Sequence, residues 1–435
     1  MPRRSVALLI ETSNGHGRGL LDGVVAYVKE SADWSVFLTE QERGAVPPNW
    51  LKNWRGDGII ARIETDDIAD QLRDLHVPIV DLSATRHVKG IPWTSTDDTA
   101  IAALAVQHFM ERGFHNLAYC GDPGFAWSNL RRDRYRELTL AAERKFFEYQ
   151  STHRYDPQFD WEQEKTRLGH WLQMLPRPVA IMACYDFQAQ QVLDACRQSR
   201  IAVPEAVAVL GVDNDHLICE LAEPSLSSIV QDTHGTGYEA ARLLDEMMDS
   251  QLPTSTNNQR STNQRSTNRL KLPEENRLSG ALFSESGVPM DPPLLTKPLG
   301  IMVRESTDTL AIDDHEISQA LQYIRRHAHA NIRVCDVLKP LSLSRRSLEH
   351  RFKKLIGRTP HEEIQRVRLN SVKRLLSETE LSIAAIAERS GYEHGEYMTS
   401  VFRRVTGLTP TEYRREQQNA LGVDRNPQSN PQIQD

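Results

Sequence analysis

The loops that follow apolar runs in the N-terminal half carry side chains of the kinds that bind sugars. Planar polar groups contact pairs of sugar hydroxyls, and an aromatic ring often covers the apolar face of a sugar. These loops offer Ser13, Asn14, His16, Arg18, Arg62, Trp127, Arg131, Asp186, Asp213 and Asn214. Together the residue types predict a pocket for a small sugar. For each residue alone, solvation at the surface or the capping of a helix is the alternative, and it is strongest for Asp186 and Asp213.

A second set of residues, near the C-terminus, forms a helical pattern that occurs twice. In the first copy an apolar helix stripe precedes a turn at 341–343, and Ser344 caps the next helix. The stripe and the predicted buried side of the capped helix are Ile332, Val334, Val337, Leu338, Leu348, Phe352 and Leu355. In the second copy Gly391 makes the turn. The apolar positions around it are Ile383, Ile386, Ala387, Tyr392, Met398 and Phe402.

Both copies end in the same way, with Gly-x-Thr-Pro at 357–360 and 407–410. Glycine ends one helix with a positive φ, and proline begins the next at its first position. A tight turn, a packed inner face and a polar outer face are what a helix-turn-helix requires. The pattern therefore predicts two helix-turn-helix motifs. Pro340 should end the first helix early, and Ser342 stands where a turn glycine is common.

The elements that position the sugar-binding residues alternate between strands and helices. Apolar, β-branched runs at 5–10, 34–38, 58–63, 77–82, 116–121, 179–186 and 207–213 predict strands that are buried on both faces. Amphipathic stretches lie between them, so we expect parallel sheets with helices on both faces. In such folds ligands bind outside the carboxyl ends of the strands, where the polar residues stand. From about Asp313 onward the chain is predicted to be all-helical.

The charges divide unevenly along the chain of 435 residues, whose formal net charge is −7. Residues 315–416 hold 19 Lys and Arg against 12 Asp and Glu, which is +7; the rest holds 33 against 47, which is −14. A basic unit joined to an acidic one favours a C-terminal unit that meets DNA phosphates. A charged, solvated face is the alternative.

Two segments have the composition of disordered chain. Residues 251–293 contain an imperfect polar repeat at 255–269, and we expect a disordered insertion because the repeat buries too little apolar area to fold. A basic arm that contacts DNA is the alternative. The tail 417–435, rich in Gln, Asn and Pro, is also predicted to be disordered.

Several classes of protein are disfavoured. No stretch approaches the roughly twenty apolar residues of a membrane span, and the apolar run 5–10 ends at Glu11 without a cleavage site. We therefore expect a cytoplasmic chain with no membrane partner. Five scattered cysteines favour small buried hydrophobes over disulfides or a zinc site. The common catalytic motifs are absent, and Asp97 and Asp98 resemble a helix start rather than an acid–base pair. We therefore expect no enzyme, no cofactor and no metal.

The segment from Ile383 to Arg414 resembles the signature of AraC-type regulators. It reads Ile-x-x-Ile-Ala, Gly-Tyr, Tyr-Met-x-x-x-Phe-Arg-Arg and Gly-x-Thr-Pro-x-x-Tyr-Arg. The resemblance covers about 100 residues, taken as 313–416, and implies two DNA-reading helices joined by a helix at 361–377. It also implies promoter DNA and RNA polymerase as partners, since AraC-type domains usually activate transcription.

The outward positions of the two reading helices supply the expected DNA contacts. On the first helix, Arg346, Glu349 and His350 face bases, and Arg345, Lys353, Lys354 and Arg358 face phosphates. On the second helix, the outward residues are Gly395, Glu396, Thr399 and Ser400, with Arg403 and Arg404 nearer phosphate. Because the second face has few long donors, weaker base readout is expected there.

Residues 1–308 resemble the sugar-binding core shared by LacI-type repressors and periplasmic sugar-binding proteins, without the N-terminal DNA headpiece of the repressors. Such a two-lobed core joined to an AraC-type domain is the architecture of the xylose operon regulators. The motifs that match are Gly-Asp-Gly-Ile-Ile-Ala (56–61), Gly-His-Trp-Leu-Gln-Met-Leu-Pro (169–176), Gly-Val-Asp-Asn (211–214), Ser-Leu-Ser-Ser-Ile-Val-Gln (225–231) and Arg-Glu-Ser-Thr-Asp (304–308).

The resemblance implies hydroxyl-binding roles for Arg131, Asp186 and Asp213, although Arg134 stands where a small residue is common. It also implies a D-xylose effector, with arabinose, ribose or a hexose as alternatives, and a homodimer. A transport-binding protein is the remaining alternative, but it would need a signal peptide and would not carry helix-turn-helix motifs.

Overall fold

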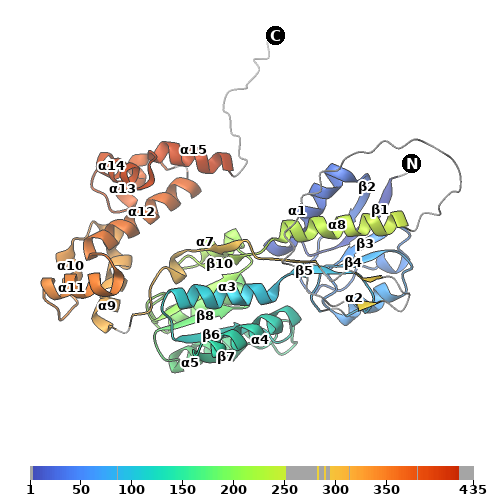
Figure 1. The fold of residues 1–435 in the computed structure, drawn as a ribbon, viewed down its shortest axis with the longest axis horizontal. Coiled ribbons are helices and arrows are strands. Elements are labelled where there is room, and N and C mark those ends of the chain that lie inside the picture. Colours follow the sequence, from blue (N-terminus) through green and yellow to red (C-terminus); the bar gives the residue numbers. More distant parts are fainter. Residues whose placement is uncertain are drawn as a thin grey trace, which may run out of the picture. The chain divides into compact units, whose positions relative to one another are not determined.

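The chain folds into two compact units, Met1–Thr309 and Leu310–Asp435 (Figure 1). The computed structural model describes residues 3–85, 87–250, 282–283, 289–290, 294–312, 314–379 and 381–420. The first unit contains parallel sheets covered by helices, and the described part of the second is helical. This is the fold class that the sequence predicts.

A four-stranded parallel sheet forms the first lobe of the N-terminal unit. Its strand order is β2 (Trp34–Leu38), β1 (Arg4–Leu9), β3 (Gly58–Ala61) and β4 (Ile79–Asp81). Successive side chains of a strand point to opposite faces. Val6 and Leu8 therefore join the core under α1 (Gly15–Ser31) and α8 (Thr233–Ser250). Ala7 and Leu9 pack on the other face, in a core that also contains residues of η1 (Leu51–Asn53) and α2 (Asp66–Arg73).

Helices α1 and α8 lie side by side on this lobe (Figure 1). Glycines allow their close approach, because a Cβ at Gly23 would lie 2.0 Å from His234 O and one at Gly237 would lie 1.9 Å from Leu20 O. Residues distant in sequence thus complete one lobe.

A six-stranded sheet forms the second lobe. Its order is β14 (Gly300–Met302), β10 (Ser227–Val230), β9 (Val207–Val212), β8 (Val179–Ala183), β6 (Asn116–Gly121) and β7 (Lys145–Gln150). All pairs are parallel except β10 with β14. The helices of this lobe are α3 (Asp98–Glu111), α4 (Ala126–Ala141), α5 (Trp161–Met174), α6 (Asp186–Gln198) and α7 (His216–Leu221).

The chain passes between the lobes at residues 96–98, 230–233 and 296–300. Two of these passages are paired, because β5 (Thr94–Thr96) runs parallel to β13 (Leu294–Thr296). After β14, η3 (Glu305–Thr307) leads to the end of the unit. The lobes are therefore joined by a bundle of short connections rather than by one linker.

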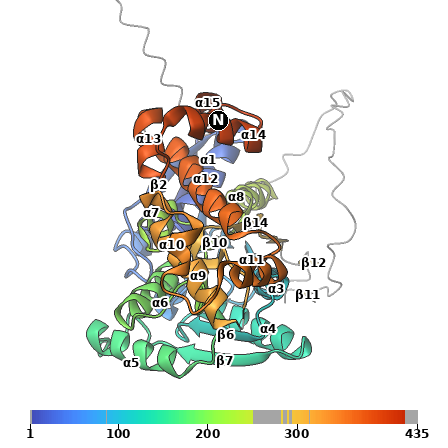
Figure 2. The same cartoon turned by 90° about the vertical axis from the view of Figure 1, so that its left-hand side faces the viewer.

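The C-terminal unit repeats a two-helix motif on either side of a long helix, α12 (Pro360–Glu378) (Figures 1 and 2). Helices α9 (His315–His327), α10 (Val334–Leu338) and α11 (Arg345–Ile356) share a core around Val337, Leu348 and Phe352. The 3₁₀ helix η4 (Ala328–Ala330) follows α9. Helices α13 (Ile383–Arg389) and α14 (Gly395–Thr406) share a second core with α12 around Ile386, Met398 and Phe402. Helix α15 (Pro410–Ala420) follows.

The predicted helix ends are present in this unit. Gly357 and Gly407 end α11 and α14 with φ of 78° and 80°. Thr359 then caps α12 with Glu362 in a reciprocal capping box, and Thr409 and Glu412 exchange the same hydrogen bonds at the start of α15. Ser344 caps α11, and α10 ends at Leu338, before Pro340. No helix among the described residues is long and apolar enough to cross a membrane.

Some sequence predictions are wrong in detail. Strand β2 lies at a sheet edge with Val36, Phe37 and Leu38 exposed, so it is not buried on both faces. Leu355 is 38% exposed and Ile356 takes its place in the core. Cys335 is exposed, whereas the other four cysteines are buried.

The two segments predicted to be disordered are only partly described. Within 251–293, β11 (Leu282–Phe283) pairs with β12 (Pro289–Met290), and the rest lies outside the described residues. Helix α15 extends to Ala420, past the predicted start of the tail at 417, and residues 421–435 lie outside the described residues.

Candidate functional site

A pocket, called the cavity below, lies between the two lobes of the N-terminal unit. The residues that line it are His16, Arg43, Arg62, Leu82, Ala84, Ser95, Thr96, Asp98, Trp127, Arg131, Asp213 and Gln231. They follow the carboxyl ends of strands in both lobes, as expected for this class of fold.

Arg131 of α4 is fixed on the second-lobe side of the cavity. Its Nε donates to Asp98 Oδ1 at 2.7 Å, and its Nη1 donates to the carbonyl oxygen of Cys184 at 2.6 Å. The guanidinium carbon lies 4.9 Å from the centre of the Trp127 ring. Because Arg131 is only 4% exposed, these contacts hold a buried guanidinium against a flat aromatic surface.

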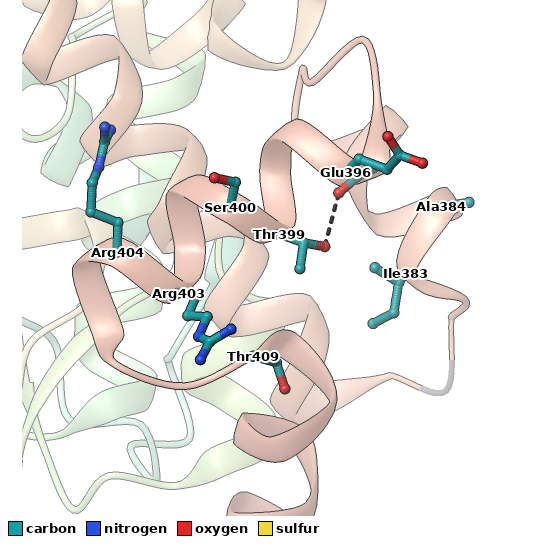
Figure 3. A pocket seen from close by; sticks show the side chains of 9 residues that line it. Ile383, Ala384, Glu396, Thr399, Ser400, Arg403, Arg404 and Thr409 are labelled. Atoms are coloured by element: carbon teal, nitrogen blue, oxygen red, sulfur yellow. Dashed lines mark hydrogen bonds between the residues drawn. The ribbon is translucent and has the colours of Figure 1, made fainter.

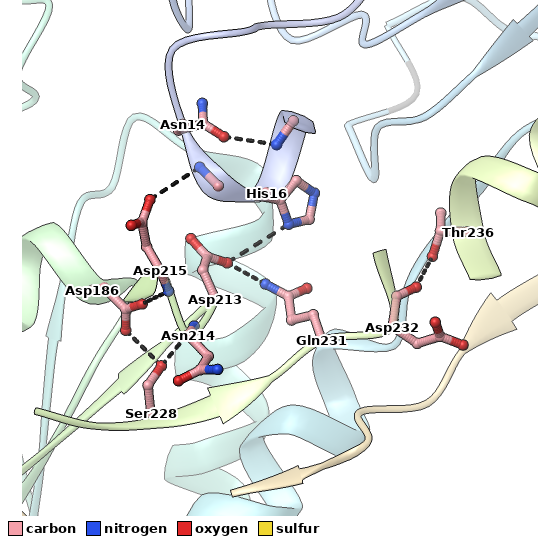
Figure 4. Close-up of polar contacts among 12 residues, drawn as sticks. Asn14, His16, Asp186, Asp213, Asn214, Asp215, Ser228, Gln231, Asp232 and Thr236 are labelled. Carbon is pink, nitrogen blue, oxygen red and sulfur yellow. Dashed lines mark hydrogen bonds and ion pairs between the residues drawn. The ribbon is translucent and has the colours of Figure 1, made fainter. Parts of the chain in front are cut away.

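Asp213 joins the lobes at the cavity (Figure 4). Its Oδ1 accepts a hydrogen bond from Gln231 Nε2 and lies 3.7 Å from His16 Nδ1 of the first lobe. Burial lowers the pKa of His16, so this ring is neutral at neutral pH. Burial alone would raise the pKa of Asp213, but the hydrogen bond with His16 and the charges of Arg131 and Arg43 lower it instead. Asp213 is therefore an ionised acceptor facing the cavity.

Carboxylates hold a second guanidinium on the first-lobe side. Arg62 donates to Glu11 from Nη1 and to Glu64 from Nη2. Glu11 also lies 3.5 Å from Arg43 Nε. Burial alone would raise the pKa of Glu11, but the charges of Arg62 and Arg43 lower it to about 2. Glu11 is therefore ionised at neutral pH and pairs with both guanidiniums.

Four polar atoms of the lining residues are buried and have no hydrogen-bond partner in the described part of the chain. They are Arg43 Nε, Arg62 Nε, Trp127 Nε1 and Gln231 Oε1. Buried polar groups are almost always hydrogen-bonded, because an unpaired one costs about 1–3 kcal/mol. Three donors and one acceptor suit a ligand whose groups can both donate and accept, which describes a hydroxyl.

In the C-terminal unit, the outer faces of α11 and α14 carry the residues predicted to contact DNA. Arg345, Arg346, His350, Lys353 and Lys354 are exposed on α11. Glu349 accepts a hydrogen bond from Arg345 Nε at 2.9 Å, and Arg358 pairs with Glu363 of α12. The apolar residues of both helices point the other way, into the two cores.

A shallow groove runs along α14 (Figure 3). It is lined by Ile383, Ala384, Gly395, Glu396, Thr399, Ser400, Arg403, Arg404 and Thr409. All six residues predicted on the second reading helix thus line one surface. Thr399 Oγ1 donates to the Gly395 carbonyl oxygen at 2.9 Å. The hydroxyl hydrogen of Thr399 is therefore used within its own helix.

Comparisons with known proteins place this architecture in a family. Residues 5–98 match the XylR N-terminal domain, 106–269 a periplasmic binding protein-like domain, and 338–416 a helix-turn-helix domain. The xylose operon regulatory protein of Escherichia coli K12 is 31% identical over 420 residues, which are 95% of this chain and 97% of that protein. The chain belongs to the family of xylose operon regulators.

Two further comparisons agree with this assignment. The xylose operon regulatory protein of Haemophilus influenzae is 29% identical over 94% of this chain and 97% of its own length. A solved structure described as the xylose-binding transcription activator xylR matches with a TM-score of 0.75 and 30% identity, covering 96% of this chain and 99% of that one. The family consists of transcription regulators, so the prediction of a sugar-binding regulator rather than an enzyme is confirmed.

The cavity of this regulator contains five of the ten residues whose types predict the sugar pocket: His16, Arg62, Trp127, Arg131 and Asp213. The other five, Ser13, Asn14, Arg18, Asp186 and Asn214, do not line it. Ser13 is exposed, and Arg18 is half exposed with its Nη1 donating to the Thr12 carbonyl oxygen at 3.0 Å. Ser13 precedes α1 and Arg18 lies in its first turn, near the cavity but not in its lining.

Asp186 does not line the cavity either, and its carboxylate accepts hydrogen bonds from other residues of the second lobe. Its Oδ1 accepts from Ser228 Oγ at 2.6 Å, and its Oδ2 accepts from the Asp215 amide at 2.7 Å (Figure 4). The residue is almost completely buried at the first turn of α6. It therefore supports the turn that carries Asp213 and does not cap a helix, since the N-cap of α6 is Tyr185.

Sequence reasoning missed several lining residues, above all Arg43, Asp98 and Gln231. Asp98 was assigned to a helix start, and Asp97 is indeed the cap of α3, but Asp98 points inward to Arg131. Gln231 directly follows β10, so the rule that ligands bind at strand ends could have found it. Arg43 lies in an irregular loop, where no periodic pattern indicates direction.

Proposed function

We propose that the chain is a D-xylose-responsive activator of transcription, in which the sugar binds between the two lobes. The observation that carries this proposal is the cavity between the lobes, whose unpaired buried donors and acceptor match a polyhydroxylated ligand. The identity of the sugar rests on the relatives, which are xylose operon regulatory proteins, and on a solved relative described as xylose-binding.

The charges around the cavity favour a neutral sugar over a sugar phosphate. Arg43, Arg62 and Arg131 are the guanidiniums, and Glu11, Glu64, Asp98 and Asp213 are the carboxylates that face or pair with them. Since the positive charges are already matched by negative ones, a phosphate would gain no unpaired cation and would face Asp213. A neutral ligand can instead accept from guanidinium N–H groups and donate to carboxylates.

A thermal-shift and calorimetric series with pentoses and hexoses tests the proposal. A ligand at one hundred times its Kd stabilises a protein by about 2.7 kcal/mol, which is readily measured. We expect D-xylose to stabilise the chain at the lowest concentration. Stabilisation by another sugar class but not by xylose would assign a different effector, and stabilisation by none would contradict the sensing role.

The C-terminal unit is proposed to read promoter DNA with α11 and α14 in successive major grooves. Arg346, Glu349 and His350 would contact bases, and Arg345, Lys353 and Lys354 phosphates. On α14, Gly395, Glu396, Thr399 and Ser400 would face bases, with Arg403 and Arg404 on the backbone. The Arg345–Glu349 ion pair supports this division, because the charge of Arg345 can reduce the repulsion between Glu349 and the DNA phosphates. A mobility-shift assay at several salt concentrations, with promoter and random DNA, tests it.

We further propose that the regulator acts in the cytoplasm as a homodimer and activates by contacting RNA polymerase. Pairing would place two double-reading units on direct or inverted half-sites. Light scattering with and without xylose and DNA tests the oligomeric state, and a monomer under every condition would remove the dimer. Transcription in vitro with purified polymerase, with and without xylose, decides between activation and repression.

A further inference from the structure

The long helix α12 belongs to both cores of the C-terminal unit (Figure 1). Ile364 and Val367 in its first half pack in the core of α9, α10 and α11, which is called the first motif below. Leu369 and Val372 pack in the core of α13 and α14, the second motif. Arg368 stands between these two sets and is only 6% exposed, although an arginine is seldom buried without partners. Its partners therefore lie at the boundary between the motifs.

The side chain of Arg368 contacts both motifs. Its Nε donates to the Ala328 carbonyl oxygen at 2.9 Å, and its Nη2 donates to the Ile332 carbonyl oxygen at 3.1 Å. Both carbonyls belong to the segment between α9 and α10, in the first motif. The guanidinium carbon lies 5.8 Å from the ring centre of Tyr392, which follows the turn glycine of the second motif. A buried guanidinium is attracted to the face of an aromatic ring, so Arg368 links the two motifs.

The turn of the second motif packs directly on the segment that Arg368 binds. A Cβ at Gly391 would lie 2.2 Å from the Ala328 carbonyl oxygen, the same oxygen that accepts from Arg368 Nε. The hydroxyl of Tyr392 donates to Gln365 Oε1 at 3.2 Å, on α12 three residues before Arg368. Three segments that are distant in sequence thus meet around one guanidinium.

We propose that Arg368 is a positioning residue that fixes the separation and the rotation between the two reading helices, α11 and α14. The inference rests on the proposed function, in which these helices enter successive major grooves. Long helices commonly curve, so α12 by itself does not fix the angle between the motifs. The contacts of Arg368 join the motifs a second time, beside the helix axis. The chain should therefore accept only one spacing between the two DNA segments that it reads.

The test measures how strictly DNA binding depends on this spacing. Footprinting of the full-length chain on promoter DNA locates the two major-groove segments, and one base pair is then inserted between them. The insertion moves one segment by about 3.4 Å and rotates it by about a tenth of a turn. The spacing penalty is the ratio of the affinities for the original and the altered DNA. For the wild-type chain we expect a penalty of about tenfold or more, since base contacts of one helix are lost.

Arg368→Met keeps an apolar stem but cannot donate to either carbonyl. In this variant the spacing penalty should fall by about threefold or more, which lies in the range of coupling between contacting groups. Arg368→Lys is the second variant. Lysine keeps the charge but offers one nitrogen where the arginine fork presents several donors in a fixed plane, so it should also lower the penalty.

Arg414→Met is the matched control. Arg414 of α15 also donates to two backbone carbonyls, from Nε to Leu376 at 3.4 Å and from Nη2 to Leu381 at 2.6 Å. Both acceptors lie beside the second core, so these hydrogen bonds do not reach the first motif. The variant should keep the wild-type spacing penalty even if its melting temperature falls. Thermal unfolding of all variants shows whether each is folded.

The outcomes separate the role of Arg368 from the proposed reading of two grooves. A wild-type penalty in either folded Arg368 variant overturns the inference. An equal fall in Arg414→Met also overturns it, because any loss of stability would then loosen the unit. If neither Arg368 variant folds, the residue serves stability and the positioning role is overturned. A wild-type chain that binds promoter DNA without a spacing penalty overturns the two-groove reading and the inference together, whereas the other failures leave that reading in place.

Discussion

Asp213→Asn should abolish most of the xylose affinity while leaving the fold intact. Asparagine keeps the shape of aspartate and tolerates the positive φ of 109° at this position, so the turn is retained. The amide removes the negative charge that faces His16 and accepts from Gln231. A hydrogen bond to a charged group contributes about 1.5–3 kcal/mol. The loss of one or two such bonds to sugar hydroxyls weakens binding by about tenfold to about 20,000-fold.

The assay for Asp213→Asn is paired. Calorimetry with xylose gives the change in affinity, and a promoter mobility shift without sugar shows whether DNA binding survives. Asp194→Asn is the control, because Asp194 is a partly exposed carboxylate on α6 of the same lobe that pairs only with Arg197 in the contacts described. Native xylose affinity in Asp213→Asn would refute its role as a ligand. Loss of sugar-free DNA binding would show a structural role instead.

Three further predictions concern DNA contacts, pH and the turn of the second motif. Arg346→Ala should cost about 1–3 kcal/mol of binding free energy on the specific site only. Lys353→Ala should instead weaken binding to promoter and random DNA alike, and should lower the slope of log affinity against log salt concentration by about one. Equal losses on both DNAs in both variants would contradict the assignment. The pKa of Glu11 falls from 4.5 to about 2 on folding, so its ionisation contributes about 3 kcal/mol to the free energy of unfolding above pH 4.5, and this contribution is lost as the pH drops toward 2. In urea titrations at several pH values, Glu11→Gln should reduce the dependence of the unfolding free energy on pH. An unchanged pH dependence in the variant would disprove the pairing. Gly391→Ala should destabilise the second motif by about 2 kcal/mol or more, since Gly391 has φ of 79° and a Cβ would lie 2.2 Å from the Ala328 carbonyl oxygen; an unaltered melting temperature would be the contrary result.

The rule that ligands bind at the carboxyl ends of parallel strands located most of the cavity from sequence. His16, Arg62, Trp127, Arg131 and Asp213 all follow such strands, and all line the cavity. The rule cannot say whether a side chain points into the cavity or back toward its own backbone. The direction of a side chain depends on partners distant in sequence. For Asp186 these partners are Ser228 Oγ and the Asp215 amide, which both donate hydrogen bonds to its carboxylate.

The helical motifs were predictable because their signals are local. Caps, glycine ends and apolar spacing lie within a few residues of one another, so sequence specifies them without knowledge of the fold. Even there, one position was wrong. Leu355 and Ile356 stand seven and eight residues after Leu348, and both spacings suit an amphipathic helix. Packing against α9 and α12 selects Ile356, which is buried, and leaves Leu355 exposed.

The turn at residues 213–215 explains how a ligand in the cavity can act on both lobes. Asp213 and Asn214 have φ of 109° and 52°, a conformation that non-glycine residues seldom adopt, and Asp186 and Ser228 hold the backbone there. From this turn Asp213 faces His16, and Asp215 Oδ2 accepts from the Gly15 amide at 3.0 Å (Figure 4). Both partners belong to the first lobe, so the turn makes contacts that join the second lobe to the first.

The same turn also contacts the end of the sensing unit. Asn214 Oδ1 accepts from Arg304 Nη1 at 2.9 Å, and Arg304 begins the segment that ends the unit at Thr309. A ligand shifts a conformational equilibrium only by the difference in its affinity for the two states. A sugar that bonded Asp213 together with His16 or Arg62 would bridge the two lobes. Its binding would then favour an arrangement in which the lobes stay together, and the turn that would bear this contact is hydrogen-bonded to the segment that ends the sensing unit.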